Sequence, residues 1–329
     1  MAENIAAVLH GPCDLRIEKW PMPEINDNEV LIKIDCCGIC GSDLKMYSAG
    51  RCGADRLTEP IVLGHEGAGF VIKVGSKVSS LAVGDRVAIE PTQPCRACEF
   101  CRQGRYNLCP EPHYCSTVGA PGNLCHYYKH VADFCHKMPD NLSMEEGAAV
   151  QPLAIAIHAC GRAGIKIGTT LLVLGAGPIG VLCAMTARAM GATKILITDV
   201  VESRLETAKK LGADLTLLIR EEYSDQQVVD KIRQMLGTSP NVTMDACGFA
   251  AAQRVAMMVS PSPSGRIKRG HRPEVVHNSS LPAGAGQRGH GVRENRRAHE
   301  NYHTHVCVTK IRLVGELRLR TIERIMHKF

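Results

Sequence analysis

The sequence predicts an α/β protein in which a β-rich domain precedes a doubly wound parallel sheet. Three observations predict it. The first 150 residues alternate between apolar and polar positions and are interrupted by turn residues. From about Pro152 the pattern changes to strand–helix alternation, and a glycine-rich turn, Gly175 to Gly180, lies between a buried strand and a helix. The predicted domains are residues 1–151, residues 152–259 and a tail over 260–329.

The first domain contains short strands bounded by turn signals. The predicted strands are Asn4 to His10, Glu29 to Asp35 and Gly67 to Val74, followed by a turn that enters a strand over Val83 to Ile89. Residues 91–110 differ, because they contain four cysteines and three prolines with little periodicity. We expect this segment, the cysteine lobe, to be ordered by something other than an apolar core.

The second domain has the pattern of a βαβ series. The predicted strands are 170–174, 194–198, 215–219 and 241–245, and the predicted helices are 179–190, 203–211, 224–236 and 250–258. The first strand is a continuous apolar run, which suits a parallel strand buried on both faces. Strands alternating with helices predict a doubly wound sheet.

The pattern ends after Val259. Residues 260–329 contain 14 Lys and Arg against 5 Asp and Glu, whereas residues 1–259 contain 25 against 28. The whole net charge of +6 therefore comes from the tail, and it does not predict a nucleic-acid partner for the protein. The tail is predicted to be largely disordered, with a candidate strand at 306–314 and a candidate basic helix at 316–328.

Composition also limits the class of protein. The N-terminus is polar and carries no secretory signal, so we expect a cytoplasmic protein whose 16 cysteines serve as thiols or metal ligands and not as disulfides. The most apolar stretch, Leu171 to Ala187, contains three glycines and a proline. It predicts a buried strand, turn and helix, and no partner membrane.

The strongest chemical signal is a set of four cysteines, Cys95, Cys98, Cys101 and Cys109. Four thiolates at short spacing in a loop suit a tetrahedral zinc that orders the segment. Reduced thiols without a metal are the plain alternative. A zinc module that binds nucleic acid is a weaker alternative, because no basic helix follows the cysteines.

A second signal indicates a dinucleotide. Gly175, Gly177 and Gly180, with Pro178 and Ile179 between them, follow a strand and open a helix, which places backbone N–H groups at a pyrophosphate. Asp199 ends the next strand, where a carboxylate accepts hydrogen bonds from the ribose of NAD and repels the phosphate of NADP. Arg204 in the following helix is a further candidate. The alternative is a packing turn with a solvated aspartate.

A third signal is dispersed along the chain. Cys40 lies in one apolar segment, and His65 and Glu66 follow about 25 residues later. Each alone is ordinary for a core or surface position. Together they offer a thiolate, an imidazole and a carboxylate, which suit a catalytic zinc with an open position.

These motifs together resemble the zinc-containing medium-chain dehydrogenases, and most closely their sorbitol dehydrogenase branch. The resemblance covers about residues 5–259. It is carried by Gly38 to Asp43, Gly64 to Glu66, Val83 to Val87, the cysteine lobe, the glycine turn with Asp199, Glu90-Pro91, Gly104 to Pro110, Tyr127 to His130 and Ile197 to Asp199.

The resemblance implies a GroES-like β-barrel catalytic domain joined to a Rossmann domain that binds NAD. It implies that Cys40, His65 and Glu66 hold a catalytic zinc, that the four lobe cysteines hold a structural zinc, and that Ser42 passes the substrate proton. The implied reaction is oxidation of a polyol such as sorbitol or xylitol, with hydride transfer to NAD. The relatives assemble as dimers or tetramers.

Three departures from the family pattern qualify this. The family has Glu-Pro-Leu where this chain has Gln151-Pro152-Leu153, and an amide cannot act as an anionic partner near the zinc. Lys45-Met46 replace a His-Tyr pair near the substrate. The tail lacks the last Rossmann strands, since the charged run Gly265 to Arg269 cannot be a central strand.

Two interpretations of the tail remain open: a translated alternative reading frame or a real basic extension. With the tail incomplete, we expect poor assembly. The alternative function is a non-catalytic remnant that binds zinc and NAD without turnover.

Overall fold

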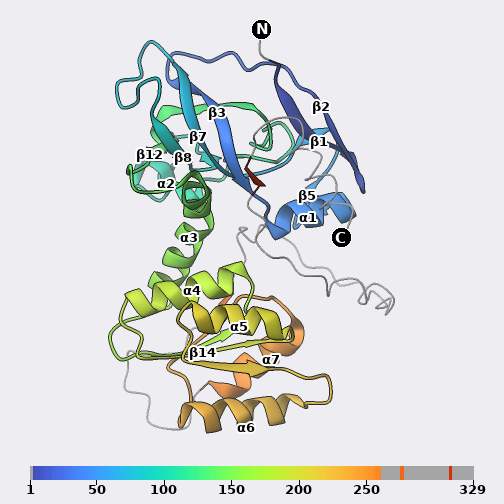
Figure 1. Ribbon diagram of the computed structural model, residues 1–329, viewed down its shortest axis with the longest axis vertical. Helices are drawn as coiled ribbons and strands as arrows, with labels where there is room; N and C mark the ends of the chain where they lie inside the picture. The colour runs from blue at the N-terminus through green and yellow to red at the C-terminus, as the bar shows by residue number, and fades with distance from the viewer. Residues whose placement is uncertain (1–2, 261–274, 278–310, 313–329) are drawn as a thin grey trace. The chain divides into compact units, whose positions relative to one another are not determined.

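The computed structural model describes residues 3–260, 275–277 and 311–312 (Figure 1). The chain divides into two compact units, and the division falls between Gln151 and Pro152. Each unit has its own apolar core.

Unit 1 is built on two principal sheets. The smaller has the order β2-β1-β6, and the larger has the order β11-β3-β7-β8-β12 with β18 also paired to β3. The strands are β1 Ile5–Gly11, β2 Asp14–Lys19, β3 Glu29–Gly38, β6 Ile61–Val62, β7 Glu66–Val74, β8 Arg86–Ile89, β11 Tyr127–Val131, β12 Cys135–Lys137 and β18 Ile311–Arg312. Two-residue pairs lie outside them: β4 Arg51–Cys52 with β5 Asp55–Arg56, and β9 Thr92–Gln93 with β10 His113–Tyr114.

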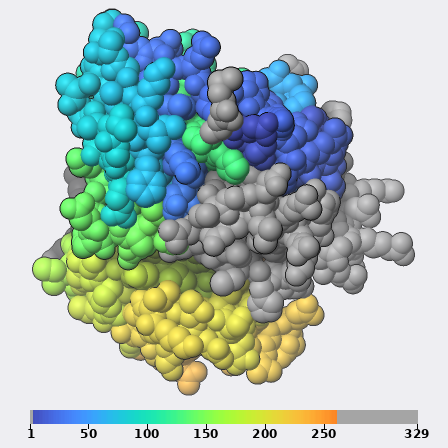
Figure 2. Space-filling model, turned by 45° about the horizontal axis from the view of Figure 1, so that its top comes forward, coloured from blue at the N-terminus to red at the C-terminus, as the bar shows by residue number. Residues whose placement is uncertain are grey.

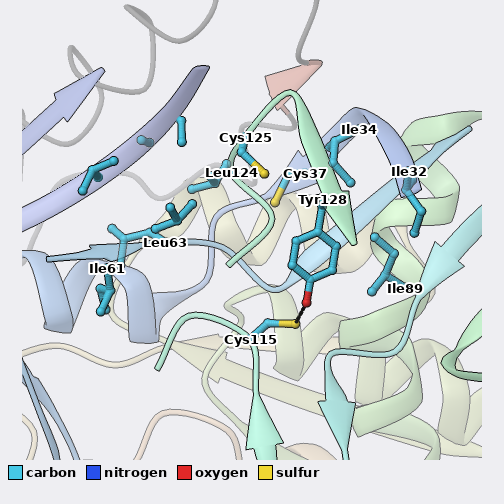
Figure 3. Close-up of a cluster of buried hydrophobic side chains, with 14 of the residues drawn as sticks. Ile32, Ile34, Cys37, Ile61, Leu63, Ile89, Cys115, Leu124, Cys125 and Tyr128 are labelled. Carbon is cyan, nitrogen blue, oxygen red and sulfur yellow. Dashed lines mark hydrogen bonds between the residues drawn. The ribbon is translucent and has the colours of Figure 1, made fainter. Parts of the chain in front are cut away.

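Strand β3 organises the core of this unit. Its side chains Ile32 and Ile34 are essentially buried and pack with Leu63, Leu124 and the ring of Tyr128 (Figure 3). Neighbouring Cys36 belongs to a second cluster formed with β7, β8 and the start of α3. Both faces of β3 are covered, so apolar residues occupy most of its positions. The sequence predicted this strand from its alternation and from the turn signals around it.

Three helices that begin in unit 1 were not predicted, and the shortest of them is α2 (Glu99–Arg102). Helix α1 (Gly41–Ala49) begins at the motif that contains Cys40 and ends at Gly50, whose left-handed φ of 61° suits glycine. Helix α3 (Met144–Arg162) runs through the division between the units and contains Pro152. A proline in a helix interior removes one hydrogen bond and normally predicts a break, so the sequence concealed this helix.

Unit 2 is a parallel sheet of order β15-β14-β13-β16-β17 with helices on both faces. Helices α4 and α5 pack on one face with Val173 and Ile195, and α6 and α7 pack on the other with Leu172 and Leu196 (Figure 1). The elements are β13 Thr170–Leu174, α4 Pro178–Ala189, β14 Lys194–Asp199, α5 Glu202–Lys210, β15 Leu215–Leu218, α6 Asp225–Leu236, β16 Val242–Asp245, α7 Ala250–Val259 and β17 Val275–His277.

These elements confirm the predicted α/β class and all four predicted strands and helices of this unit to within two residues at each end. The sequence analysis expected the tail to supply no further strand to this sheet, and strand β17 shows that this expectation was wrong. Three residues pair in parallel with β16, inside a segment whose Pro, Arg and His content hides any period.

The predicted strand over 306–314 overlaps β18, which pairs with β3 and therefore belongs to unit 1. The remaining expectations for the tail, including the charged run at 265–269 and the helix at 316–328, lie outside the described residues. Among the helices that the structure describes, none combines the length and apolarity needed to cross a membrane.

Candidate metal centres and cofactor site

The cysteine lobe brings its four thiols together. The sulfur atoms of Cys95, Cys98, Cys101 and Cys109 all lie within 4.8 Å of one another. The Cys95 and Cys101 sulfurs are 3.9 Å apart. Zn–S bonds of about 2.3 Å in a tetrahedron place sulfurs roughly 3.8 Å apart, so the cluster has the dimensions of a zinc site.

Local structure prepares these thiols for a metal. Cys98 caps the short helix α2 (Glu99–Arg102), and Cys109 follows the turn η1 (Tyr106–Leu108). The backbone N–H groups of Cys98 and Cys101 donate to the sulfurs of Cys95 and Cys98 at 3.3 and 3.4 Å. Backbone N–H groups of Ala97 and Cys98 lower the pKa of Cys95, whereas desolvation raises the pKa of the neighbouring Cys101 thiol. Thiolates are the form that binds zinc, so the donor set fits this metal.

Polar contacts tie the cysteine lobe to the rest of unit 1. Tyr106 donates to Glu90 Oε1 at 2.7 Å, and His136 lies 2.9 Å from Glu90 Oε2. Arg96 pairs with Asp133 at 2.8 Å. The lobe side chains are mostly exposed, and the segment lies on the surface of this unit (cyan in Figure 2). Without an apolar core, the lobe depends on these contacts and on the metal for its order.

A second cluster joins Cys40, His65 and Glu66, whose ligand atoms also lie within 4.8 Å of one another. Cys40 precedes α1, and Glu66 opens β7 directly opposite Gly38 of β3. A side chain at Gly38 would approach Glu66 Oε2 to 2.1 Å. Glycine at this position therefore leaves room for the carboxylate, which explains why the motif that ends at Asp43 begins with glycine.

Asp43 is a residue of this site that the sequence analysis quoted within a motif without assigning a role. Its carboxylate is 2% exposed and lies 3.6 Å from His65 Nδ1. It accepts hydrogen bonds from the backbone N–H of Cys40 at 2.9 Å and of Gly64 at 3.2 Å. A carboxylate behind an imidazole fixes the tautomer and ring orientation that a metal requires.

Burial and charge act in opposition on these groups. Burial by itself raises the pKa of Asp43 and lowers that of His65, but their mutual attraction reverses both effects. The net result is a lowered pKa for Asp43 and a raised pKa for His65. Burial raises the pKa of Glu66 to about 7. One thiol, one imidazole and one carboxylate that converge in a buried place fit a zinc with one position open to a ligand.

The other residues predicted near this centre, Gln151, Ser42 and Lys45-Met46, differ in burial and in their contacts. Gln151 donates from Nε2 to the hydroxyl of Tyr114 at 3.4 Å, and the ring of Tyr114 lies 5.7 Å from that of His65. Ser42 is half-buried in the first turn of α1, two residues after Cys40. Lys45 is exposed, whereas Met46 is 4% exposed and packs in the core. Tyr114 is a second residue that the sequence analysis missed.

The glycine turn has the backbone of a dinucleotide site. Gly175 has a φ of 101°, Gly177 caps α4, and Pro178 is the first helical residue, where it needs no hydrogen-bond acceptor. A side chain at Gly180 would approach the Gly175 carbonyl oxygen to 1.9 Å. Ile179 follows Pro178 in the same first turn. The N–H groups at the start of α4 are therefore accessible to an anionic pyrophosphate.

Asp199 closes this turn from β14. Its Oδ2 accepts a hydrogen bond from the backbone N–H of Ala176 at 2.7 Å, and its Oδ1 accepts one from Val201 at 2.9 Å. Arg204 Nη1 lies 3.8 Å from the same carboxylate. Each carboxylate oxygen has two lone pairs, so both retain acceptor capacity for a ribose hydroxyl. The cradle and its acidic residue fit NAD.

Comparisons with known proteins agree with this geometry. The family model described as alcohol dehydrogenase GroES-like domain matches residues 26–140, and the model described as zinc-binding dehydrogenase matches residues 178–267. A sorbitol dehydrogenase of Bombyx mori is 70% identical over 260 residues, which are 79% of this chain and 75% of the relative.

Two solved structures are similar over most of the chain. The 2R,3R-butanediol dehydrogenase of Bacillus subtilis has a TM-score of 0.70 at 33% identity, covering 78% of this chain and 74% of its own. An alcohol dehydrogenase of Escherichia coli, solved in complex with NADH, has a TM-score of 0.71 at 27% identity, covering 79% and 74%.

A GroES-like barrel, a doubly wound nucleotide-binding sheet and two zinc-suited clusters define the class of zinc-dependent dehydrogenases. Within that class, the chain belongs to the sorbitol dehydrogenase family. It is an oxidoreductase, and its cofactors are zinc and NAD.

Proposed function

We propose that this enzyme oxidises a polyol, with sorbitol or xylitol as the first candidates, and transfers hydride to NAD. The observation that carries the proposal is the convergence of Cys40, His65 and Glu66 in one buried cluster, backed by Asp43. The 70% identity to a sorbitol dehydrogenase supports the choice of a polyol over a simple alcohol.

The two units have separate tasks in this proposal. Residues 1–151 hold the metals and the reacting hydroxyl, residues 152–259 hold NAD, and the described strand β17 extends the second sheet. When bound, zinc acts as a Lewis acid that lowers the pKa of the substrate hydroxyl, and NAD accepts the hydride.

The chain's own residues do the rest. Asp43 orients His65, while Gly175 to Gly180 present N–H groups to the pyrophosphate and Asp199 accepts hydrogen bonds from the adenosine ribose. Ser42 follows Cys40 by two residues, in the first turn of α1, and relays the proton of the substrate hydroxyl: its oxygen accepts that proton while its own O–H proton passes to water. We assign Arg204 to holding the Asp199 carboxylate in position.

Gln151 has a changed task in this chain. An amide can donate and accept hydrogen bonds, but it cannot take up a proton as the family's glutamate can. Its described partner is the hydroxyl of Tyr114. We therefore propose that Gln151 positions a neutral group beside the metal centre and that proton release depends on Ser42.

The test is NADH formation by purified protein loaded with zinc, with sorbitol and xylitol as substrates and with NAD or NADP as oxidant. We expect turnover with NAD and a strong preference over NADP, because Asp199 repels a ribose phosphate. The second candidate function, a remnant that binds zinc and NAD without catalysis, is favoured by Gln151 and the atypical tail. Stoichiometric zinc and NADH binding without turnover on either polyol would establish it.

Assembly is a separate proposal. The family resemblance favours a dimer or tetramer, and the loss of family pattern after Val259 favours incomplete assembly. Multi-angle light scattering of the zinc-loaded protein decides between them, and a single tetrameric species would reject incomplete assembly.

A further inference from the structure

The segment around Tyr114 has no place in the motifs that define the enzyme, yet Tyr114 lies beside His65 and Ser116 donates to Asp43. Tyr114 ends β10, which pairs with β9 in the cysteine lobe. Its ring lies beside His65 at 5.7 Å with a tilt of 53°. A ligand held at the Cys40–His65–Glu66 cluster is therefore next to this phenol.

The main chain on either side of Tyr114 is held firmly. Thr117 Oγ1 donates to the Tyr114 carbonyl at 2.6 Å, and the Cys115 N–H donates to Pro91 at 2.9 Å. Ser116 has a left-handed φ of 68° and donates to Asp43 Oδ1 at 3.4 Å. Backbone strain at a non-glycine residue persists where surrounding contacts impose it, and it is common at functional sites.

The side chain of Cys115 anchors the segment in the core. Its sulfur lies 2.7 Å from the hydroxyl of Tyr128, and both side chains are buried (Figure 3). The Tyr128 hydroxyl in turn lies 3.3 Å from His130 Nδ1. With Cys115 fixed in the core and Ser116 bonded to Asp43, Tyr114 is pre-organised over the metal centre.

The hydroxyl of Tyr114 keeps a proton to donate. Gln151 Nε2 donates to its oxygen, so the phenolic O–H points elsewhere. In the described part of the chain, Gln151 is the side chain that hydrogen-bonds to this hydroxyl. An ionised carboxylate at position 151 could only accept hydrogen bonds. The phenolic O–H of Tyr114 would donate to it and would no longer be free to donate to a substrate.

We propose that Tyr114 is a specificity-determining residue that donates its phenolic proton to a second hydroxyl of the substrate, on the carbon next to the reacting one. The inference rests on the proposed polyol oxidation and names what selects polyols over monohydric alcohols. A donor in a site built for hydrogen bonding discriminates against analogues that lack the acceptor. Gln151 leaves this donor free.

The test compares Tyr114→Phe with Tyr223→Phe, a matched loss of a phenolic hydroxyl in unit 2, where the Tyr223 ring contacts Lys231. Tyr114→Phe should lower kcat/KM for sorbitol roughly three- to ten-fold, mainly through KM. It should leave kcat/KM for cyclohexanol unchanged, and Tyr223→Phe should change neither. An equal loss on both substrates, or on neither, would overturn the inference.

A binding measurement separates this inference from the proposed function. Calorimetric titration of sorbitol into the enzyme–NADH complex, where no hydride acceptor is present, should show weaker binding for Tyr114→Phe by the same factor. Absence of turnover in the unmodified enzyme would reject polyol oxidation, and equal sorbitol affinity of both proteins would reject the role of Tyr114.

The role of Gln151 is tested by a double-mutant cycle that combines substitutions at positions 114 and 151. In a Gln151→Glu background the carboxylate accepts the phenolic proton, so Tyr114→Phe should no longer change the preference for sorbitol over cyclohexanol. The same three- to ten-fold effect in that background would show that Gln151 does not free the donor.

Discussion

At the scale of single residues, the catalytic centre depends on the buried carboxylate beside its histidine ligand as much as on the ligands themselves. Asp43 and His65 lie 3.6 Å apart with side chains 2% and 8% exposed. The backbone N–H groups of Cys40 and Gly64 also bind the carboxylate. Zinc binds the neutral imidazole, so removal of the Asp43 carboxylate leaves a buried N–H donor of His65 without its acceptor, and the effect should exceed that of breaking a surface pair.

We predict that Asp43→Asn weakens zinc binding at this centre roughly 10- to 100-fold, because the imidazole loses the acceptor that orients it. The measurement is zinc retention against a competing chelator, with the zinc of the cysteine lobe as an internal control. Asp14→Asn, which removes only the exposed pair with Arg16, is the matched variant. Equal zinc retention by Asp43→Asn and the unmodified protein would contradict the assignment.

At the scale of elements, helix α4 can bind a cofactor at its N-terminus because Gly180, in its first turn, has no side chain. A Cβ at Gly180 would lie 1.9 Å from the carbonyl oxygen of Gly175, so the helix can approach the turn only with glycine there. By contrast, a Cβ at Gly161 in α3 would meet nothing within 4 Å among the described residues outside its own helix backbone. Substitution of Gly180 therefore tests a steric requirement, whereas substitution of Gly161 tests helix propensity alone.

We predict that Gly180→Ala displaces the start of α4, lowers the free energy of unfolding by about 1–3 kcal/mol and weakens NADH binding. Gly161→Ala should instead be neutral or stabilise the protein by up to about 1 kcal/mol, with unchanged NADH affinity. Urea unfolding and NADH fluorescence titration measure both quantities. Normal NADH affinity in Gly180→Ala would be incompatible with this view of the turn.

Sequence information predicted best what is local. Lys194 to Thr198 and its flanking helices were recognisable because the pattern repeats within a few residues, and the four lobe cysteines lie within 15 residues of each other. Tyr114 was missed because its contact with His65 is tertiary: the fold brings β10 next to His65, and no spacing along the chain indicates that contact. Helix α3 was missed because Pro152 lies inside it.

At the scale of the whole molecule, stability depends on polar groups buried inside unit 1. His130 is 5% exposed, stacks on Tyr128 and contacts the carbonyl oxygen of Glu90 at 2.9 Å. Burial lowers its pKa, while Glu90, Asp133 and Glu29 oppose that effect. The folded protein therefore keeps this imidazole neutral at a pH where the unfolded chain has begun to protonate it.

We predict that the stability contributed by neutral His130 is complete above about pH 6.5 and falls as the pH drops below that value, because the unfolded state then binds the proton first. His130→Phe keeps a ring against Tyr128 but does not titrate. Urea unfolding of the zinc-loaded proteins between neutral and mildly acidic pH should give a steeper loss for the unmodified chain. Parallel slopes would contradict the prediction.

The central claim is that a buried Cys40–His65–Glu66 zinc centre and an NAD site in the same chain oxidise a polyol. The most direct measurement is NADH formation from sorbitol by the zinc-loaded enzyme and by Cys40→Ser, with zinc content determined for both. The account predicts turnover with two zinc ions per chain in the unmodified enzyme, and loss of both activity and one zinc in the variant. Equal activity in Cys40→Ser, or no NADH from the folded, fully loaded enzyme, would contradict it.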